Sequence, residues 1–368
     1  MERAVARIDL DAVGANCAQL KAELGRAELC AVVKADGYGH GDQACARAAL
    51  AGGASRLAVA TAVEAERLAA AFAGTPILTM GALTEAEVDV ALGAGSELTV
   101  WREGFRQQVA ARARALGRPA RVHVKHDSGM GRLGNPDPDG VVELARACAA
   151  DPDLELAGVW THFATADEPD SGYFDEQLGR FEAVATTVRG EFPEVTVHAA
   201  NSAATFLDDR SHFDMARCGV AVYGLDPFQD DPAARGLRPA LSLRSYVADV
   251  KHFRVGTSAG YGQRWAAAVE TWIGVVPVGY GDGVRRGLTN NAEVLVGGHR
   301  RPLVGTVSMD NVTIDLGPET AVRPGDEAVL IGAQGEEEIR AEELAARLGT
   351  INYEITCGIS ARVPRRPA

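Results

Sequence analysis

The sequence lacks any block of lysine and arginine residues, and its 50 acidic residues outnumber its 37 basic ones. A nucleic-acid-binding surface needs clustered positive charge, and the longest basic cluster here is only Arg362, Arg365 and Arg366. The chain also lacks an apolar stretch long enough for a signal peptide or a membrane span. We therefore expect a soluble, cytoplasmic protein that binds neither nucleic acid nor a membrane.

Several catalytic and metal-binding motifs are missing as well. The six cysteines are scattered with no C-x-x-C pair, which favours a reducing compartment over a disulfide framework. The histidines lack metal-ligand spacing, and the one suggestive stretch, "HVKHD" (123–127), has no matching carboxylate or thiolate partners for zinc. "GYGHGD" matches neither a Walker loop nor a dinucleotide fingerprint, and no G-x-S-x-G elbow is present. We therefore expect no metal.

The segment from residue 29 to about 225 alternates short apolar runs with amphipathic stretches of helical periodicity. Eight such alternations predict a (β/α)8 barrel, with a doubly wound open sheet as the alternative. The expected strands are "LCAVVK" (29–34), "LAVA" (57–60), "PILTM" (76–80), "ELTV" (97–100), "RVHVK" (121–125), "LAGVWTH" (156–162), "VTVHAAN" (195–201) and "FDMARCGVAVYG" (213–224).

The pattern of apolar residues changes after a polar, Pro/Gly-rich linker at 226–239. Strand-like runs separated by glycine turns follow, among them "INYEITCGI" (351–359), and only "AEELAARLG" (341–349) is typical of a helix. We therefore predict an α/β chain with a barrel over residues 11–235 and a mainly antiparallel β domain over 236–368.

Polar residues collect at the ends of the predicted barrel strands, where barrels carry their functional groups. Taken singly, each is explained by a solvated strand end or a satisfied buried polar group. Together they converge on one rim. They are Lys34, Lys125, Asp127, Arg132, His162, Asn201, Ser202, Arg217 and Gly219.

Lys34 directly follows an apolar run, and burying its ammonium group would be costly unless the charge is paired or lost. A desolvated lysine can lose its proton near neutral pH and form a Schiff base with a carbonyl cofactor, which points to pyridoxal 5'-phosphate. "NSAA" (201–204) and the glycine turn at Gly219 follow the seventh and eighth strands, where barrels usually bind phosphate. Gly219 would serve equally as a tight turn.

The stretch "VVKADGYGHG" (32–41) resembles the cofactor-lysine motif of bacterial alanine racemases. Further similar motifs follow in the order of that family over almost the whole chain. They are "KHDSGMGRLG" (125–134), "WTHFA" (160–164), "NSAA" (201–204), "RCGVAVYG" (217–224), "AGYGQRW" (259–265), "VGYGDG" (278–283), "GTVSMDNVTIDL" (305–316) and "GISARVPR" (358–365).

The resemblance implies a pyridoxal-phosphate enzyme of fold type III that interconverts L- and D-alanine, supplying D-alanine for peptidoglycan. It implies that residues 1–10 contribute a strand to the C-terminal domain. It also implies a homodimer in which the barrel of one subunit and the β domain of the other form each active site.

The resemblance assigns the two proton-transfer groups. Lys34 would hold the cofactor and act as the base for the D-enantiomer, while Tyr261 of the partner subunit would act on the L-enantiomer. A free phenol has a pKa near 10, and His162 and Arg217 would assist Tyr261 through nearby positive charge. Arg217 would face the pyridine nitrogen and, because it keeps its proton, leave that nitrogen largely unprotonated.

The remaining roles also follow from the resemblance. Arg132 would contact the cofactor and the substrate carboxylate, supported by Lys125, which is carbamylated in some relatives. The backbone of Met309 would complete the carboxylate site. The phosphate and cofactor contacts fall to Tyr38, Asn201, Ser202, Gly219 and Val220, and the narrow opening to Tyr280 and Asp310.

One departure from the family pattern is Ala361, where several relatives carry a tyrosine that contacts the phosphate and narrows the opening. A slightly larger amino acid such as serine would then be an additional substrate. Three competing interpretations are a type III decarboxylase, which should carry an acidic partner for the pyridine nitrogen, a barrel protein without turnover, which should lack the β domain, and a broad-specificity racemase, which is often exported.

Overall fold

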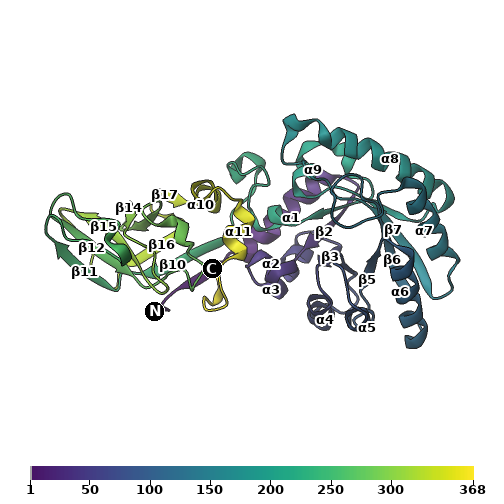
Figure 1. Cartoon of the computed structure of the whole chain (residues 1–368), viewed down its shortest axis with the longest axis horizontal. Helices are drawn as coiled ribbons and strands as arrows, with labels where there is room; N and C mark the ends of the chain where they lie inside the picture. Colours follow the sequence, from purple (N-terminus) through teal and green to yellow (C-terminus); the bar gives the residue numbers. More distant parts are fainter. Residues whose placement is uncertain (1) are drawn as a thin grey trace. The chain divides into compact units, whose positions relative to one another are not determined.

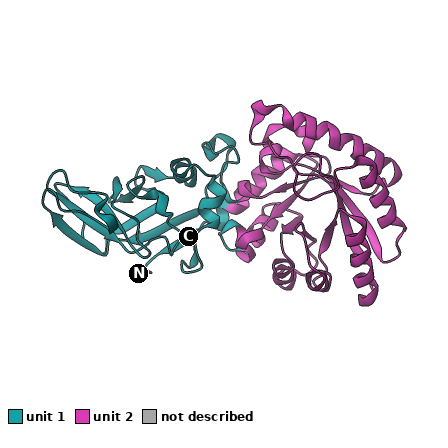
Figure 2. Ribbon diagram, viewed as in Figure 1, with its two compact units in different colours: residues 1–12, 38–41, 223–368 teal, residues 13–37, 42–222 magenta. Residues whose placement is uncertain are grey.

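The computed structural model describes residues 2–368 and divides the chain into two compact units (Figures 1 and 2). The unit described first, magenta in Figure 2 and called unit 2 in its key, holds Val13–Gly37 and Asp42–Val222. The unit described second, teal and called unit 1 in the key, holds the chain up to Ala12, together with Tyr38–Gly41 and Tyr223–Ala368. The division thus falls at Tyr223, a few residues before the polar linker from which we predicted the boundary.

The first unit is a closed barrel of parallel strands, which confirms the predicted fold class. The barrel closes where Glu28 on the first strand aligns with Met215 on the last, and this pairing excludes the open sheet. The strands are short runs buried on both faces, as parallel sheets require. They are β2 (Glu28–Val32), β3 (Arg56–Val59), β4 (Ile77–Thr79), β5 (Glu97–Val100), β6 (Ala120–Lys125), β7 (Leu154–Trp160), β8 (Thr196–His198) and β9 (Met215–Cys218).

Helices alternate with these strands and bury one apolar face each. In α8 (Tyr173–Glu191) the buried set includes Phe174, Leu178, Phe181 and Val188, whose spacing places them on one helical face. The other helices of this part of the chain are α1 (Leu10–Leu24), α3 (Asp42–Ala51), α4 (Ala62–Ala71), α5 (Glu85–Gly93), α6 (Glu103–Leu116), α7 (Pro138–Ala150) and α9 (Ser202–Leu207).

The second unit is built on a ten-stranded, mainly antiparallel sheet. Its order along the sheet is β11-β12-β15-β14-β13-β16-β10-β1-β18, with β17 paired to β16. The strands are β1 (Val5–Ile8), β10 (Leu241–Tyr246), β11 (Asp249–Phe253), β12 (Thr271–Val276), β13 (Glu293–Val296), β14 (His299–Val304), β15 (Val312–Gly317), β16 (Glu327–Gln334), β17 (Glu337–Ile339) and β18 (Arg365–Pro367).

The strand β1 lies inside this sheet. It pairs antiparallel with β10 and parallel with β18, so that Ala6 is aligned with both Leu243 and Arg365. The first residues of the chain therefore complete the sheet formed by its C-terminal part. Burial follows the two-residue period of a strand in β10, where Leu241, Leu243 and Ser245 are buried and the residues between them are not.

The strand predicted at 351–359 is wrong, because residues Asn352–Cys357 form the helix α11, which follows α10 (Ala341–Leu348). The β-branched residues Ile355 and Thr356 suggested a strand. The buried positions are instead Asn352, Ile355 and Thr356, which lie on one helical face. The side chain of Asn352 donates to the backbone oxygen of Asp226 and to Glu342, both at 2.8 Å, and these buried bonds hold the helix start.

Among residues 2–368, no helix is long and apolar enough to cross a membrane. The same residues contain no cluster of histidine, cysteine, aspartate or glutamate that could hold a metal ion.

Candidate active site

The polar residues predicted to share a rim do lie at the carboxyl ends of the barrel strands. Lys125 is the last residue of β6, and Arg217 is near the end of β9. Lys34 and His162 each lie two residues beyond a strand, and Ser202 begins α9 directly after β8. Because all strands are parallel, these positions come to one end of the barrel.

Lys34 is followed by a turn of unusual backbone conformation, labelled α2 (Lys34–Tyr38). Ala35, Asp36 and Gly37 have φ near 53–62° and ψ near 45–49°, which is the left-handed helical region. This conformation costs roughly 1–2 kcal/mol for each residue that has a Cβ. The carboxylate of Glu64 holds the turn, since it accepts the N–H of Ala35 at 2.7 Å while its other oxygen accepts the N–H of Ala60 at 2.9 Å.

Arg217 is buried and held from several sides. It donates to Nδ1 of His198 at 2.8 Å, to the carbonyl oxygens of Thr161 at 2.8 Å and Ala199 at 3.0 Å, and to Nδ1 of His162 at 3.4 Å. Its guanidinium carbon also lies 4.4 Å from the ring centroid of Trp160. Burial lowers the pKa of Arg217 to about 10, so the group keeps its charge at neutral pH.

Positive charge accumulates around this point. Lys125 is buried with its Nζ atom 4.3 Å from the Trp160 ring centroid. Burial, reinforced by the charges of Arg217, Arg132 and Lys34, lowers its pKa to about 7 despite the opposing charge of Asp127. Burial and the same kind of cationic surroundings hold the pKa of His162 well below its usual value. The rim is therefore a site that favours an anionic ligand.

Arg132 lies in the loop after β6, which Asp127 shapes. The carboxylate of Asp127 accepts the backbone N–H groups of Gly129 at 3.1 Å, Gly131 at 3.0 Å and Arg132 at 3.2 Å. Although burial opposes ionisation, these backbone hydrogen bonds lower the pKa of Asp127. The loop is thus fixed at its backbone, while the Arg132 residue itself is exposed.

The stretch predicted to bind phosphate forms a compact polar turn. The hydroxyl oxygen of Ser202 accepts the N–H of Gly219 at 3.0 Å and that of Ala221 at 3.4 Å. The side chain of Asn201 accepts the N–H of Ala204 at 2.9 Å and caps α9. Val220 begins the short 3-10 turn Val220–Tyr223. The Ser202 hydroxyl proton takes no part in those two bonds and can be donated to an oxygen anion.

The remaining predicted residues belong to the second unit. Tyr38 is buried there, with ring centroids 5.2 Å from Tyr223 and 6.0 Å from Tyr353. Tyr261 is 73% exposed and Met309 is 51% exposed. These residues therefore belong to one unit, whereas Lys34 and Arg217 belong to the other.

Two loops of the second unit are tied together at Tyr280, Met309 and Asp310. The N–H of Tyr280 donates to the carbonyl oxygen of Ser308, and that of Gly281 to the carbonyl oxygen of Met309, both at 2.9 Å. Arg362 pairs with Asp310 at 2.6 Å. These contacts fix the backbone of Met309 and the position of Asp310 relative to Tyr280.

Sequence reasoning missed several residues that organise the rim. Trp160 was quoted only within a motif, yet its ring faces both Lys125 and Arg217. Glu64 has the sequence pattern of an ordinary capping residue, and its bond to the turn after Lys34 has no signal in the sequence. His198 had a signal, since a polar residue inside the apolar run "VTVHAAN" is out of place in a buried parallel strand.

The residues of the rim fit a phosphate-bearing carbonyl compound. Lys34 could condense with a carbonyl group, and its charge, with those of Arg217 and Arg132, adds to burial in lowering the pKa of Lys125. The hydroxyl of Ser202 and the charged groups can receive a phosphate.

Known protein families and relatives match both parts of the chain. The family model described as the alanine racemase N-terminal domain matches residues 8–227, and that of the alanine racemase C-terminal domain matches residues 240–367. The chain is 45% identical to an alanine racemase of Frankia casuarinae over 99% of this chain and 96% of that protein. It is 42% identical to alanine racemase 1 of Bacillus subtilis over 98% of this chain and 92% of that protein.

Solved structures give the same result. The crystal structure of alanine racemase from a D-cycloserine-producing Streptomyces lavendulae superposes with a TM-score of 0.94 at 39% identity, covering 100% of this chain and 97% of that chain. Both domains, the full length and the motifs thus agree, and the chain belongs to the alanine racemase family.

Proposed function

We propose that this protein is a pyridoxal-phosphate-dependent alanine racemase, an isomerase that interconverts L- and D-alanine and supplies D-alanine for peptidoglycan. The single observation that carries the proposal is Lys34 at the rim of the barrel, among Lys125, Arg132 and Arg217. Full-length similarity to alanine racemases supports the choice of reaction.

Pyridoxal 5'-phosphate, when bound, supplies an aldehyde that condenses with amines and a conjugated ring that accepts electron density. Lys34 would bind its aldehyde carbon, and Arg217 would face its ring nitrogen. Tyr38, Asn201, Ser202, Gly219 and Val220 would hold the phosphate and neighbouring groups. Arg217 can only donate, so it leaves the ring nitrogen without a proton, which limits the electron sink and favours simple proton return.

Racemisation requires one group to remove the α-proton and another to return a proton on the opposite face. Lys34 would serve the D-enantiomer, and Tyr261 of the partner subunit would serve the L-enantiomer. The exposure of Tyr261 in the single chain supports a role in the site of another subunit. His162 and Arg217 would favour the phenolate through hydrogen bonding and positive charge.

The substrate carboxylate would meet Arg132 and the backbone of Met309. Lys125 would support Arg132. Because two cations repel each other, this support needs a neutral or carbamylated Lys125, and the lowered pKa of Lys125 favours the loss of its proton. Tyr280 and Asp310 would line the opening, where the ion pair with Arg362 orients Asp310.

The test is circular dichroism of L-alanine incubated with the purified protein, combined with an absorbance spectrum. The native protein should abolish the optical signal of L-alanine and absorb as a cofactor bound to lysine. Lys34→Ala should lose both properties, whereas the exposed Lys251→Ala should keep both. An unchanged spectrum in Lys34→Ala would rule out Lys34 as the cofactor lysine.

Tyr261→Phe tests the second base. This variant should keep the cofactor spectrum and lose racemisation, most strongly when the reaction starts from L-alanine, because the phenol alone takes the proton on that face. Full activity would exclude Tyr261 from proton transfer.

A broader alanine and serine racemase is the second candidate, and the exposed Ala361 in place of a tyrosine favours it. A panel of L-amino acids in the same optical assay distinguishes the two. A type III decarboxylase is disfavoured because Arg217, a donor only, occupies the position where an acidic partner is expected.

A further inference from the structure

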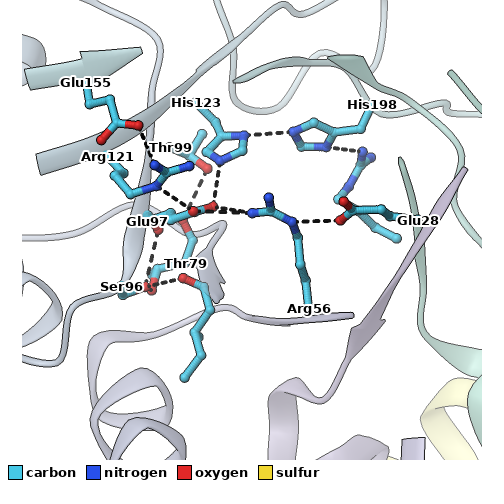
Figure 3. A network of polar contacts seen from close by, with 12 residues as sticks. Glu28, Arg56, Thr79, Ser96, Glu97, Thr99, Arg121, His123, Glu155 and His198 are labelled. Atoms are coloured by element: carbon cyan, nitrogen blue, oxygen red, sulfur yellow. Dashed lines mark hydrogen bonds and ion pairs between the residues drawn. The ribbon is translucent and has the colours of Figure 1, made fainter. Parts of the chain in front are cut away.

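A chain of buried polar side chains runs through the interior of the barrel from Arg217 to Glu97. Arg217 donates to Nδ1 of His198 at 2.8 Å, Nε2 of His198 lies 2.9 Å from Nδ1 of His123, and Nε2 of His123 lies 2.8 Å from Oε2 of Glu97 (Figure 3). His123, His198 and Glu97 are all buried. Barrel interiors are normally packed with branched apolar side chains, so these groups need a reason.

The chain joins the two ends of the barrel. Glu97 is the first residue of β5, at the amino end of the strands, whereas Arg217 lies near the carboxyl end of β9 and His198 ends β8. Arg56 and Arg121 bind the carboxylate of Glu97 from the amino end, with Arg56 3.0 Å and Arg121 2.8 Å away. We call the charged residues Glu28, Arg56, Glu97, Arg121 and Glu155 the floor of the barrel.

The hydrogen bonds allow only one placement of the imidazole protons. A guanidinium group can only donate, so Nδ1 of His198 must accept and its proton must sit on Nε2. That proton is donated to Nδ1 of His123, and the proton of His123 therefore sits on Nε2, where the Glu97 carboxylate accepts it. Both rings are neutral in this arrangement, and every bond of the chain points from Arg217 toward Glu97.

Two observations show that the imidazole rings are held in place. A Cβ atom at Gly158 of β7 would lie 2.1 Å from Nδ1 of His123, so only glycine leaves room for that ring. The ring of Trp160 stacks on the ring of His198, with 5.6 Å between the ring centroids and 8° between the ring planes. Glu97 stays ionised at neutral pH. Burial opposes its ionisation, but hydrogen bonds from His123 and Arg121 outweigh burial and lower its pKa to about 2.

We propose that Glu97 and His123 are positioning residues for the reaction. By fixing the tautomer of His198 they hold Arg217 in one orientation from the far end of the barrel, with its donors directed as the cofactor ring requires. The effect on turnover rests on the proposed function. The assignment of the two imidazole tautomers is independent of that function.

The first experiment needs no variant and no substrate. Nitrogen NMR of the holoenzyme labelled with 15N-histidine should show two buried rings with Nε2 protonated and Nδ1 unprotonated. A protonated Nδ1 on His198, or rapid exchange between tautomers, would overturn the proposal. This readout stands even if the protein proved to act on an amino acid other than alanine.

The second experiment compares Glu97→Gln with Glu155→Gln. Both residues pair with Arg121, but only Glu97 contacts His123. A glutamine amide can donate to Nε2 of His123 as well as accept from it, so Glu97→Gln should leave the imidazole tautomers mixed. It should also lower kcat on the order of tenfold with little change in KM, and raise the pyruvate released per racemisation event. Pyruvate would report transamination, the side reaction in which the amino group of alanine remains on the cofactor and the keto acid is released, and which a misplaced Arg217 would permit. Glu155→Gln should leave all of these readouts unchanged.

A third variant separates positioning from simple stability. Gly158→Ala leaves every charge in place, but its Cβ would press on the His123 ring and lie 2.9 Å from the backbone oxygen of Thr196. Displacement of the ring should reproduce the tautomer change and the rise in pyruvate. If Glu97→Gln and Gly158→Ala altered only the unfolding midpoint, with tautomers, kcat and pyruvate release as in the native enzyme, the chain would be structural and the proposal wrong.

Discussion

The two ends of the barrel treat charge in opposite ways. At the floor, Arg56 lies between Glu28 and Glu97, and Arg121 between Glu97 and Glu155, so that each cation meets carboxylates within the fold (Figure 3). At the rim, the charges of Arg217, Arg132 and Lys34 add to burial in lowering the pKa values of Lys125 and His162. The floor pairs its cations with carboxylates, whereas the rim brings several cations close to one another.

This difference separates stability from function within one barrel. Charges that are paired in the fold should contribute to the free energy of unfolding. Removing such a charge should lower the stability of the protein whether or not a ligand is bound. At the rim, burial and the nearby charges of Arg217, Arg132 and Lys34 oppose the protonated form of Lys125, which costs stability, and a bound anion would offset that cost. Substitutions at the two ends should therefore have effects of opposite sign.

The largest effect is expected for Arg217→Gln compared with Arg121→Gln. Loss of Arg217 should lower kcat/KM for alanine by about 10²–10³, because one preorganised charged donor beside the reacting ring is removed. Arg121→Gln leaves Glu97 with Arg56 and His123, so activity should stay within roughly threefold of the native value. Equal losses in the two variants would abolish the distinction between rim and floor.

Lys125→Met should make the cofactor-free protein more stable. The pKa of Lys125 is about 7 in the fold against 10.5 for an ordinary lysine, so the unfolded chain binds more protons between these values and stability rises with pH. Below pH 7 the full shift in pKa corresponds to about 5 kcal/mol of destabilisation, which the variant would relieve. The variant would also lose the contact between Lys125 and the Trp160 ring, which contributes about 1–2 kcal/mol. We expect a net gain of about 3 kcal/mol at pH 6.

Urea unfolding at fixed protein concentration between pH 6 and 10 measures this gain. The variant should also lose most of the rise in stability between pH 7 and 10. If the variant were less stable and its stability depended on pH as that of the native protein does, burial and the neighbouring charges would not destabilise protonated Lys125.

Glu97→Gln should have the opposite sign. The pKa of Glu97 is about 2 in the fold against an ordinary value of 4.5, so its contribution is complete above pH 4.5 and is lost as the pH falls toward 2. The amide still accepts a hydrogen bond, and we expect a loss of about 2 kcal/mol at pH 7. Unfolding curves at pH 7 and pH 3 should show a difference between native and variant proteins that shrinks at the lower pH.

The smallest effect is expected for Ala35→Gly. Ala35 has φ of 53°, and removing its Cβ relieves about 1–2 kcal/mol of strain, partly offset by the greater freedom of glycine in the unfolded chain. We expect a gain of about 0.5 kcal/mol. The matched variant Ala65→Gly, within helix α4, should instead lose stability. A loss at both sites would show that the turn after Lys34 is not strained.

The sequence predicted the barrel well because its strands are contiguous apolar runs, and "ELTV" coincides with β5. It also placed Lys34, Lys125 and Arg217 at one rim, since parallel strands bring their carboxyl ends together. It failed at Asn352–Cys357, where tertiary hydrogen bonds of Asn352 decide the conformation.

The chain from Arg217 to Glu97 could not be predicted from spacing, because its members come from four different strands. His123 was considered only as part of an unfavoured zinc site. The signal that was available lay in the composition of the strands: a carboxylate in "ELTV" and imidazoles in "RVHVK" and "VTVHAAN" are foreign to buried parallel strands. Which partners satisfy them is a property of the closed barrel and its register.

The placement of β1 between β10 and β18 has a consequence for synthesis on the ribosome. The barrel is complete once Val222 has emerged, but β1 has no neighbours until β10 arrives and its sheet is not finished until Arg365–Pro367 follow. At roughly 5–20 residues per second, the intervening residues take on the order of 10–30 s to appear. During that interval Val5–Ile8 is first unpaired and then, once β10 has arrived, paired on one side only, next to a barrel that has already folded. A chaperone that binds short apolar segments would find a substrate in Val5–Ile8 during this time.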